Sequence, residues 1–132
     1  MAVYSVRVEV SPGEMIDKIT ILEIKAERMT DAEKLANVRT ELDSLTADRD
    51  AAIPVSAELD ACAAALRKVN ETLWDIEDEI RACERAKDFG PRFVELARSV
   101  YVNNDERAAI KRRINEMLGA RIVEEKSYQA YR

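Results

Sequence analysis

The sequence predicts an all-α, single-domain protein over residues 1–132, built around a long antiparallel helical hairpin. The composition is the first observation behind this class, because 36% of the residues are charged, 5% are aromatic, and glycine and proline occur three times each. Such a profile is typical of long helices and not of a sandwich or barrel. The second observation is an apolar seam in the middle of the chain, and the third is a set of helix-capping signals on either side of it.

The seam predicts the first helix of the hairpin, and a glycine and a proline after it predict the start of the second. The members of the seam recur at alternating spacings of three and four residues, which is the spacing of a coiled coil: Leu59, Cys62, Leu66, Val69, Leu73, Ile76, Ile80 and Cys83. A helix over about 57–88 follows from it. Gly90 is suited to a left-handed helix end, and Pro91 can open a fourth helix that runs to about 118 before Gly119. The short turn between the two helices implies antiparallel packing.

Two shorter helices are expected before the hairpin. Ser11 to Glu14 form a capping box, with Pro12 at the first helical position, and this predicts a helix over about 12–29. Thr30 to Glu33 repeat the capping box, which predicts a second helix over about 31–49. One continuous helix through Thr30 is the alternative.

Alternating residues at the start of the chain predict a β-strand over residues 3–10. Tyr4, Val6, Val8 and Val10 fall on one face, and polar side chains fall on the other. A strand needs a partner. The two options are pairing with the tail around 121–124 and pairing across a dimer axis.

Composition also excludes several classes of function. The net charge of −5 argues against a general nucleic-acid binder, because such a protein needs a positive field. No stretch resembles a membrane span or a signal peptide, so we expect a cytoplasmic protein. Histidine is absent, and the two cysteines lie on one predicted helix, about 31 Å apart at 1.5 Å per residue. We therefore expect no metal site, no cofactor and no catalytic residue of the common kinds.

The candidate site is a polar interruption in a second apolar seam, on the fourth helix, whose apolar members are Phe93, Leu96, Val100, Ile110, Ile114 and Met117. Asn103 and Arg107 would face the third helix near Trp74 and Glu77, and buried polar groups need partners. One interpretation is a structural polar layer that fixes the register. Another is a ligand pocket in which Arg107 holds a small anion, Asn103 and Tyr101 orient it, and Trp74 forms a wall. A helix break at Asn103 would instead bring these residues to the surface.

Two dense runs of charge are interpreted as solvated helix faces. Lys111, Arg112 and Arg113 lie beside acidic residues that can pair with them, although the run is also a possible anion site. The acidic run 75–79 lacks the histidine of a di-iron motif and is followed by Arg81 and Arg85 at pairing distance.

Nearly the whole chain resembles an uncharacterised bacterial family of small proteins that carries a domain-of-unknown-function label. Four stretches carry the resemblance: SPGEMIDKITILEIKAERMTDAEKLANV, VNETLWDIEDEIRACE, FGPRFVELARSVYVNNDERAAIKRRIN and EEKSY. The resemblance implies a bacterial, all-helical protein with no established activity. A weaker likeness to helical chorismate mutases rests on residues 16–19 with Leu22 and Arg28, but no arginine precedes Ile16 on that helix.

Taken together, these observations favour a non-catalytic, homo-oligomeric interaction or assembly module. A homodimer is expected, because the seam is long and the first helix is apolar over a broad surface. A small-anion or metabolite-binding bundle is the alternative, followed by a chorismate-mutase-like helical enzyme. The expected partners are a second copy of the chain, another protein or a small anionic ligand.

Overall fold

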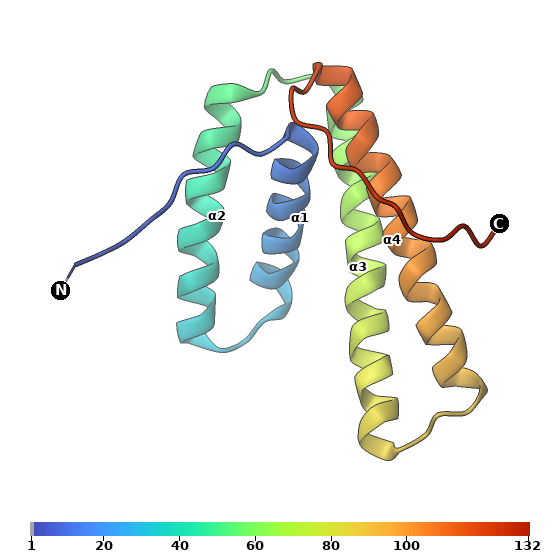
Figure 1. Ribbon diagram of the computed structural model, residues 1–132. Helices are drawn as coiled ribbons and strands as arrows, with labels where there is room; N and C mark the ends of the chain where they lie inside the picture. The colour runs from blue at the N-terminus through green and yellow to red at the C-terminus, as the bar shows by residue number, and fades with distance from the viewer. Residues whose placement is uncertain (1) are drawn as a thin grey trace.

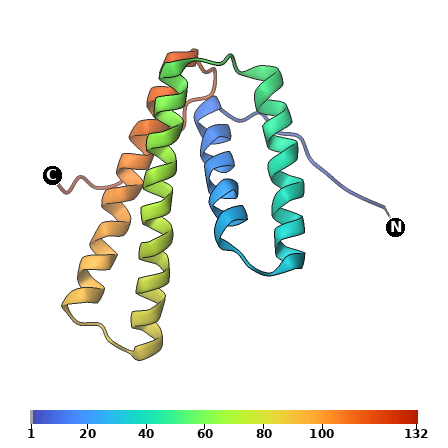
Figure 2. The same ribbon diagram turned by 180° about the vertical axis from the view of Figure 1, so that it is seen from behind.

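The computed structural model describes residues 2–132, and that range contains four helices. They are α1 (Pro12–Arg28), α2 (Ala32–Ala52), α3 (Ala57–Ala86) and α4 (Pro91–Leu118). The helices form two antiparallel pairs, α1 with α2 and α3 with α4, which splay apart from their shared upper end (Figures 1 and 2). The all-helical class is confirmed. None of these helices is long and apolar enough to cross a membrane.

Side-chain caps start the first three helices. The Ser11 hydroxyl accepts from the Glu14 backbone N–H at 3.2 Å, and the Ser56 hydroxyl accepts from Leu59 at 3.0 Å. Asp31 caps α2, accepting from the Lys34 N–H at 2.9 Å, so α2 starts one residue later than the expected bound and continues three residues further. The extended backbone at Met29 separates α1 from α2, which rules out one continuous helix.

The turn between α3 and α4 differs from the expected one. Lys87, and not Gly90, takes the left-handed conformation that ends α3, with φ 55°. Gly90 is extended and precedes Pro91, while its N–H donates to the Asp88 carboxylate at 3.1 Å. Gly119 does adopt the left-handed conformation, with φ 62°, at the end of α4.

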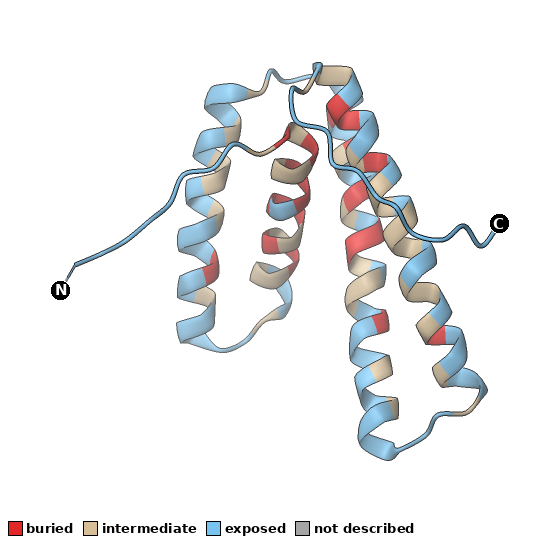
Figure 3. Cartoon of the chain, viewed as in Figure 1, coloured by how far each residue is buried: buried red, intermediate tan, exposed pale blue. Residues whose placement is uncertain are grey.

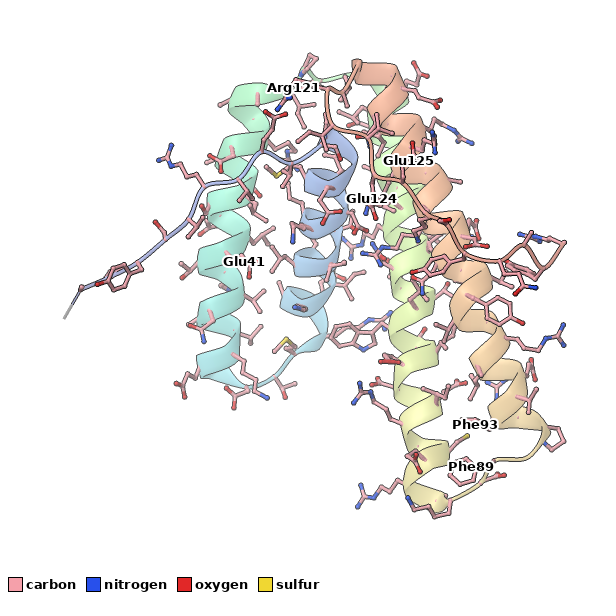
Figure 4. All side chains as sticks on the ribbon, viewed as in Figure 1. Glu41, Phe89, Phe93, Arg121, Glu124 and Glu125 are labelled. Carbon is pink, nitrogen blue, oxygen red and sulfur yellow. The ribbon has the colours of Figure 1, made fainter. Side chains whose placement is uncertain are left out.

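Helix α1 is the centre of the fold. It packs against α2, α3 and α4, whereas α2 contacts no helix other than α1. The core lies where α1 meets the upper part of the α3–α4 hairpin, around Leu66 and Ile114, which are fully buried. The lower part of the hairpin projects beyond α1, and burial fades there (Figure 3). At its tip, the rings of Phe89 and Phe93 pack edge to face at 5.2 Å (Figure 4).

The strand predicted over residues 3–10 is wrong. Within the described residues the N-terminal arm (residues 2–10) is extended but belongs to no sheet, and no backbone hydrogen bond outside the helices involves it. Val3, Tyr4, Val6 and Val8 are 73–93% exposed. The alternation is present, but no strand lies beside it. Its one ion pair with the tail joins Glu9 and Arg121 at 2.6 Å.

Candidate functional site

The deepest polar group of the molecule is the carboxylate of Asp17. The side chain lies on α1 and is 1% exposed. Asp17 shares a helix face with Thr20 and Ile24, which are also buried, so α1 turns it towards the other helices. A buried carboxylate is costly unless other groups hydrogen-bond to it.

Two other helices supply those partners. Arg107 of α4 binds the carboxylate through two hydrogen bonds: its Nε donates to Oδ1 at 2.9 Å, and its Nη2 donates to Oδ2. Asn70 of α3 donates its amide to Oδ1 at 2.9 Å and also to the Thr20 hydroxyl at 2.9 Å. The Thr20 hydroxyl in turn donates to the Asp17 carbonyl at 2.8 Å. This network ties three helices together at one level, and we call it the Asp17 cluster.

Lys111 forms a second layer next to the Asp17 cluster. Its ammonium lies 2.7 Å from Glu14 of α1, 3.0 Å from Glu124 of the C-terminal tail (residues 120–132), and 4.0 Å from Asp17, although its side chain is only 12% exposed. Figure 4 labels Glu124 on the C-terminal tail. Burial disfavours the charged form, but the hydrogen bonds to Glu14 and Glu124 outweigh it and hold the pKa of Lys111 above its usual value.

A close approach of two backbones sets this geometry. The Gly13 N–H donates to the Asn115 side-chain oxygen at 2.7 Å, and a Cβ at Gly13 would lie 2.4 Å from the Lys111 carbonyl oxygen. Only glycine allows α1 and α4 to meet so closely here. The next residue, Glu14, is thereby placed beside Lys111. Its carboxylate pairs with Lys111 and does not reach back to the helix cap, as the capping box had suggested.

A small polar cavity opens beside this second layer. Its volume is about 250 Å³, and its polar lining comes from Glu14, Asn104, Arg107, Lys111, Glu124 and Lys126. A larger cavity of about 720 Å³ lies further along the tail and shares Asn104 and Lys126 with the first. Val100, Tyr101, Tyr128 and Tyr131 supply its apolar and aromatic lining.

The structure brings Arg107 to this site but separates it from the residues predicted beside it. Asn103 donates to the Ser99 carbonyl at 2.8 Å within its own helix. Trp74 lies beneath the Arg28 guanidinium at 5.8 Å, and Glu77 pairs with Arg81 at 3.2 Å on an exposed face. Tyr101 lines the larger cavity, where its ring meets Tyr131 edge to face at 4.9 Å.

The partners of Arg107 were missed because they come from other parts of the chain. Asp17 and Glu14 lie on α1, Asn70 lies beside the seam of α3, and Glu124 lies in the tail. Lys111 was interpreted as part of a solvated face, which is wrong for Lys111 but right for Arg112 and Arg113. The signal available in the sequence was a polar pair, Asp17 and Thr20, at helical spacing beside the apolar stripe of α1.

Comparison with known proteins gives one match. The family model described as a family of unknown function (DUF6165) matches residues 6–131. The chain belongs to this family. Curated proteins and solved structures give no match. The stretches of sequence that carry the family resemblance include Asp17, Asn70, Arg107, Lys111 and Glu124, which lie far apart in the chain and meet at this site.

Proposed function

We propose that this DUF6165 member is a non-catalytic, self-associating interaction module that pairs with a second copy of itself through its N-terminal arm. The observation that carries the proposal is the arm, which is extended and exposed and has no backbone hydrogen bond to the rest of the described chain. An unpaired extended segment with alternating apolar side chains is a template for strand addition.

The charges of the arm favour one register for such a pairing. In an antiparallel two-fold pair centred on Val8, Val6 faces Val10 of the second copy, and Arg7 faces its Glu9 twice across the axis. Centring the pair on Arg7 would bring two arginines together, and centring it on Val6 would place Arg7 opposite Ser5. The register centred on Val8 therefore has complementary charges.

The surroundings of the arm leave space for a second strand. Val6, Val8 and Val10 line a cavity of about 680 Å³ together with Met15 of α1 and Leu45 of α2. The ion pair between Glu9 and Arg121 lies at the surface, with side chains 51% and 78% exposed. Exposed pairs contribute little to stability, so Glu9 can exchange Arg121 for a partner on another chain.

The two sequence features that suggested a dimer, the long seam and the broad apolar surface of the first helix, no longer support one. The broad apolar surface of α1, including Ile19 and Ile24, is covered by the other helices of the same chain. Leu66 and Val69 of the long seam are likewise buried within the chain. Self-association therefore rests on the arm and not on α1 or the seam.

A charge-swap series tests the proposal by sedimentation equilibrium. We expect the parent protein to sediment at twice its chain mass of 15.0 kDa. Arg7→Glu should weaken association about tenfold, because two attractive cross-strand pairs become repulsive. The double variant Arg7→Glu, Glu9→Arg should restore it, and Arg39→Glu on the exposed face of α2 is the matched control. A concentration-independent monomer mass for the parent protein would overturn the proposal.

A second candidate function, binding of a small anionic ligand, is favoured by the polar cavity beside Lys111. The expected ligand residue Arg107 is already engaged by Asp17, so Lys111 and Lys126 take the main role in this version. The likeness to chorismate mutases gains no support, because Arg28 pairs with Asp75 at 2.7 Å, on a surface away from this cavity.

A further inference from the structure

Beyond Ala120, whose N–H donates to the Asn115 carbonyl at 2.9 Å, the C-terminal tail lies along α4 and is held there by side chains. After the left-handed turn at Gly119 the chain reverses direction, and the tail follows α4 back towards its middle (Figure 1). Glu124 pairs with Lys111, Glu125 lies 3.7 Å from Arg112, and the ring of Tyr131 meets Tyr101. No backbone hydrogen bond outside the helices involves residues 121–132.

The attachment through Glu124 is distinct from the others. Arg112 and Glu125 are both mostly exposed, so their ion pair is a surface contact. Lys111 is nearly buried, and Glu124 reaches it from the tail with a side chain that is itself 53% exposed. A carboxylate that is half exposed to solvent therefore pairs with a cation that the fold has largely buried.

The balance of charge around the small cavity depends on this carboxylate. Three cations, Arg107, Lys111 and Lys126, are matched by Glu14 and Glu124 in the lining and by Asp17 behind it. Asp17 and Glu14 are fixed by α1. Rotation of the Glu124 side chain into solvent would leave one positive charge in excess inside a polar cavity roofed by the tail. An oxyanion would fill that place.

We propose that Glu124 is a built-in occupant of an anion site, and that the natural ligand is a phosphomonoester with a flat or apolar body. This inference rests on the second candidate function. The phosphate would displace Glu124 from Lys111, while the body would lie in the larger cavity among Val100, Tyr101 and Tyr131. The two cavities are neighbours that share Asn104 and Lys126 in their linings, so a phosphate in one and its attached body in the other would lie side by side.

A phosphate is favoured over a carboxylate for a thermodynamic reason. The tail presents Glu124 at an effective concentration of the order of millimolar, as short tethers do. A free carboxylate ligand has the same charged group as Glu124 but lacks the tether, so it does not displace Glu124 from Lys111. A phosphate dianion brings more charge and a third acceptor oxygen, and the donors of Asn104, Lys111 and Lys126 are available to it.

The test compares two adjacent glutamates of the tail. Glu124→Gln removes the competing charge at Lys111, and Glu125→Gln removes the same charge one residue away at Arg112. Calorimetric titration with phenyl phosphate should show about tenfold tighter binding by Glu124→Gln than by Glu125→Gln or the parent protein. Inorganic phosphate should bind more weakly than phenyl phosphate, and benzoate should bind weakest.

Lysine substitutions complete the test. Lys126→Gln should abolish the gain that Glu124→Gln gives, and it should leave the fold intact, because Lys126 is exposed and forms no ion pair among the described residues. Lys111→Met should abolish binding as well, with circular dichroism to verify that it folds. If parent, Glu124→Gln and Glu125→Gln bind phenyl phosphate equally, the inference about Glu124 is overturned while anion binding stands. If none of these three proteins binds phenyl phosphate, both the inference about Glu124 and the proposal of anion binding are overturned.

Discussion

Removal of the Asp17 carboxylate should be the most damaging single change to a side chain in the polar site. Asp17→Ala deletes the acceptor of two Arg107 hydrogen bonds and one Asn70 hydrogen bond, and it leaves the guanidinium without its partner. Breaking a buried ion pair costs about 3–5 kcal/mol. The cost should lie at the lower end of this range, because the Arg107 side chain is 30% exposed and its guanidinium can rotate towards solvent. We expect the free energy of unfolding to fall by about 3 kcal/mol.

That loss converts into a temperature that calorimetry can measure. The entropy of unfolding is about 2.1 cal/mol/K per residue, so for 132 residues a loss of about 3 kcal/mol lowers Tm by about 10 °C. Asp75→Ala is the matched control, since Asp75 also pairs with an arginine, at 2.7 Å, but is 63% exposed. It should cost less than about 1 kcal/mol.

Urea unfolding and calorimetry of both variants decide the matter. An Asp17→Ala protein that loses no more stability than Asp75→Ala would refute the view that burial determines the energy of these two pairs. The same result would refute the assignment of the Asp17 cluster as the joint between α1 and the α3–α4 hairpin. Circular dichroism should show that both variants remain helical.

Three further predictions concern the backbone and pH. Gly13→Ala should cost about 2 kcal/mol in urea unfolding, because its Cβ would press on the Lys111 carbonyl, whereas Gly90→Ala meets only an exposed side chain and should cost much less. Lys87→Gly should raise stability by about 0.5–1 kcal/mol, because it relieves a left-handed residue. Lys111 has a raised pKa, so its stabilising contribution is complete below its ordinary pKa of 10.5 and is lost as the pH rises through the raised value. Lys111→Met should therefore show a flatter fall in Tm across the alkaline range, and an unchanged slope would contradict this.

Much of the fold could be predicted from the sequence, because helix formation here is encoded locally. The seam spacing located α3, and Ser11 and Ser56 mark helix starts by hydrogen bonds to residues three positions ahead. The error at the α3–α4 turn has a physical reason. Glycine adopts the left-handed conformation most easily, but α3 ends before it reaches Gly90, with Lys87 as its left-handed residue. Gly90 is extended and immediately precedes α4, which begins at Pro91.

The strand predicted over residues 3–10 was wrong because alternation of apolar and polar side chains is a property of one segment alone. A β-strand also needs a second segment that hydrogen-bonds to its backbone. Within residues 2–132, an ion pair joins Arg121 of the tail to Glu9 of the arm, but no backbone hydrogen bond joins the two segments. The same limit applied to the site. Arg107 was found because it interrupts a seam, but its partner Asp17 is separated by 90 residues, and only the packing of α1 against the hairpin joins them.

The polar groups of this protein differ in how completely its own chain satisfies them, and that difference separates structural from functional roles. The carboxylate of Asp17, on α1, is fully satisfied by donors from α3 and α4, and no buried side-chain nitrogen or oxygen in the described residues lacks a hydrogen-bond partner. Lys111 depends partly on an exposed tail residue, Glu124, which solvent or a ligand can replace. The backbone of the arm has no hydrogen-bond partner outside itself in the described chain. Dependence on a second molecule should increase in the same order, so the arm and the Lys111 cavity are better places than Asp17 to look for function.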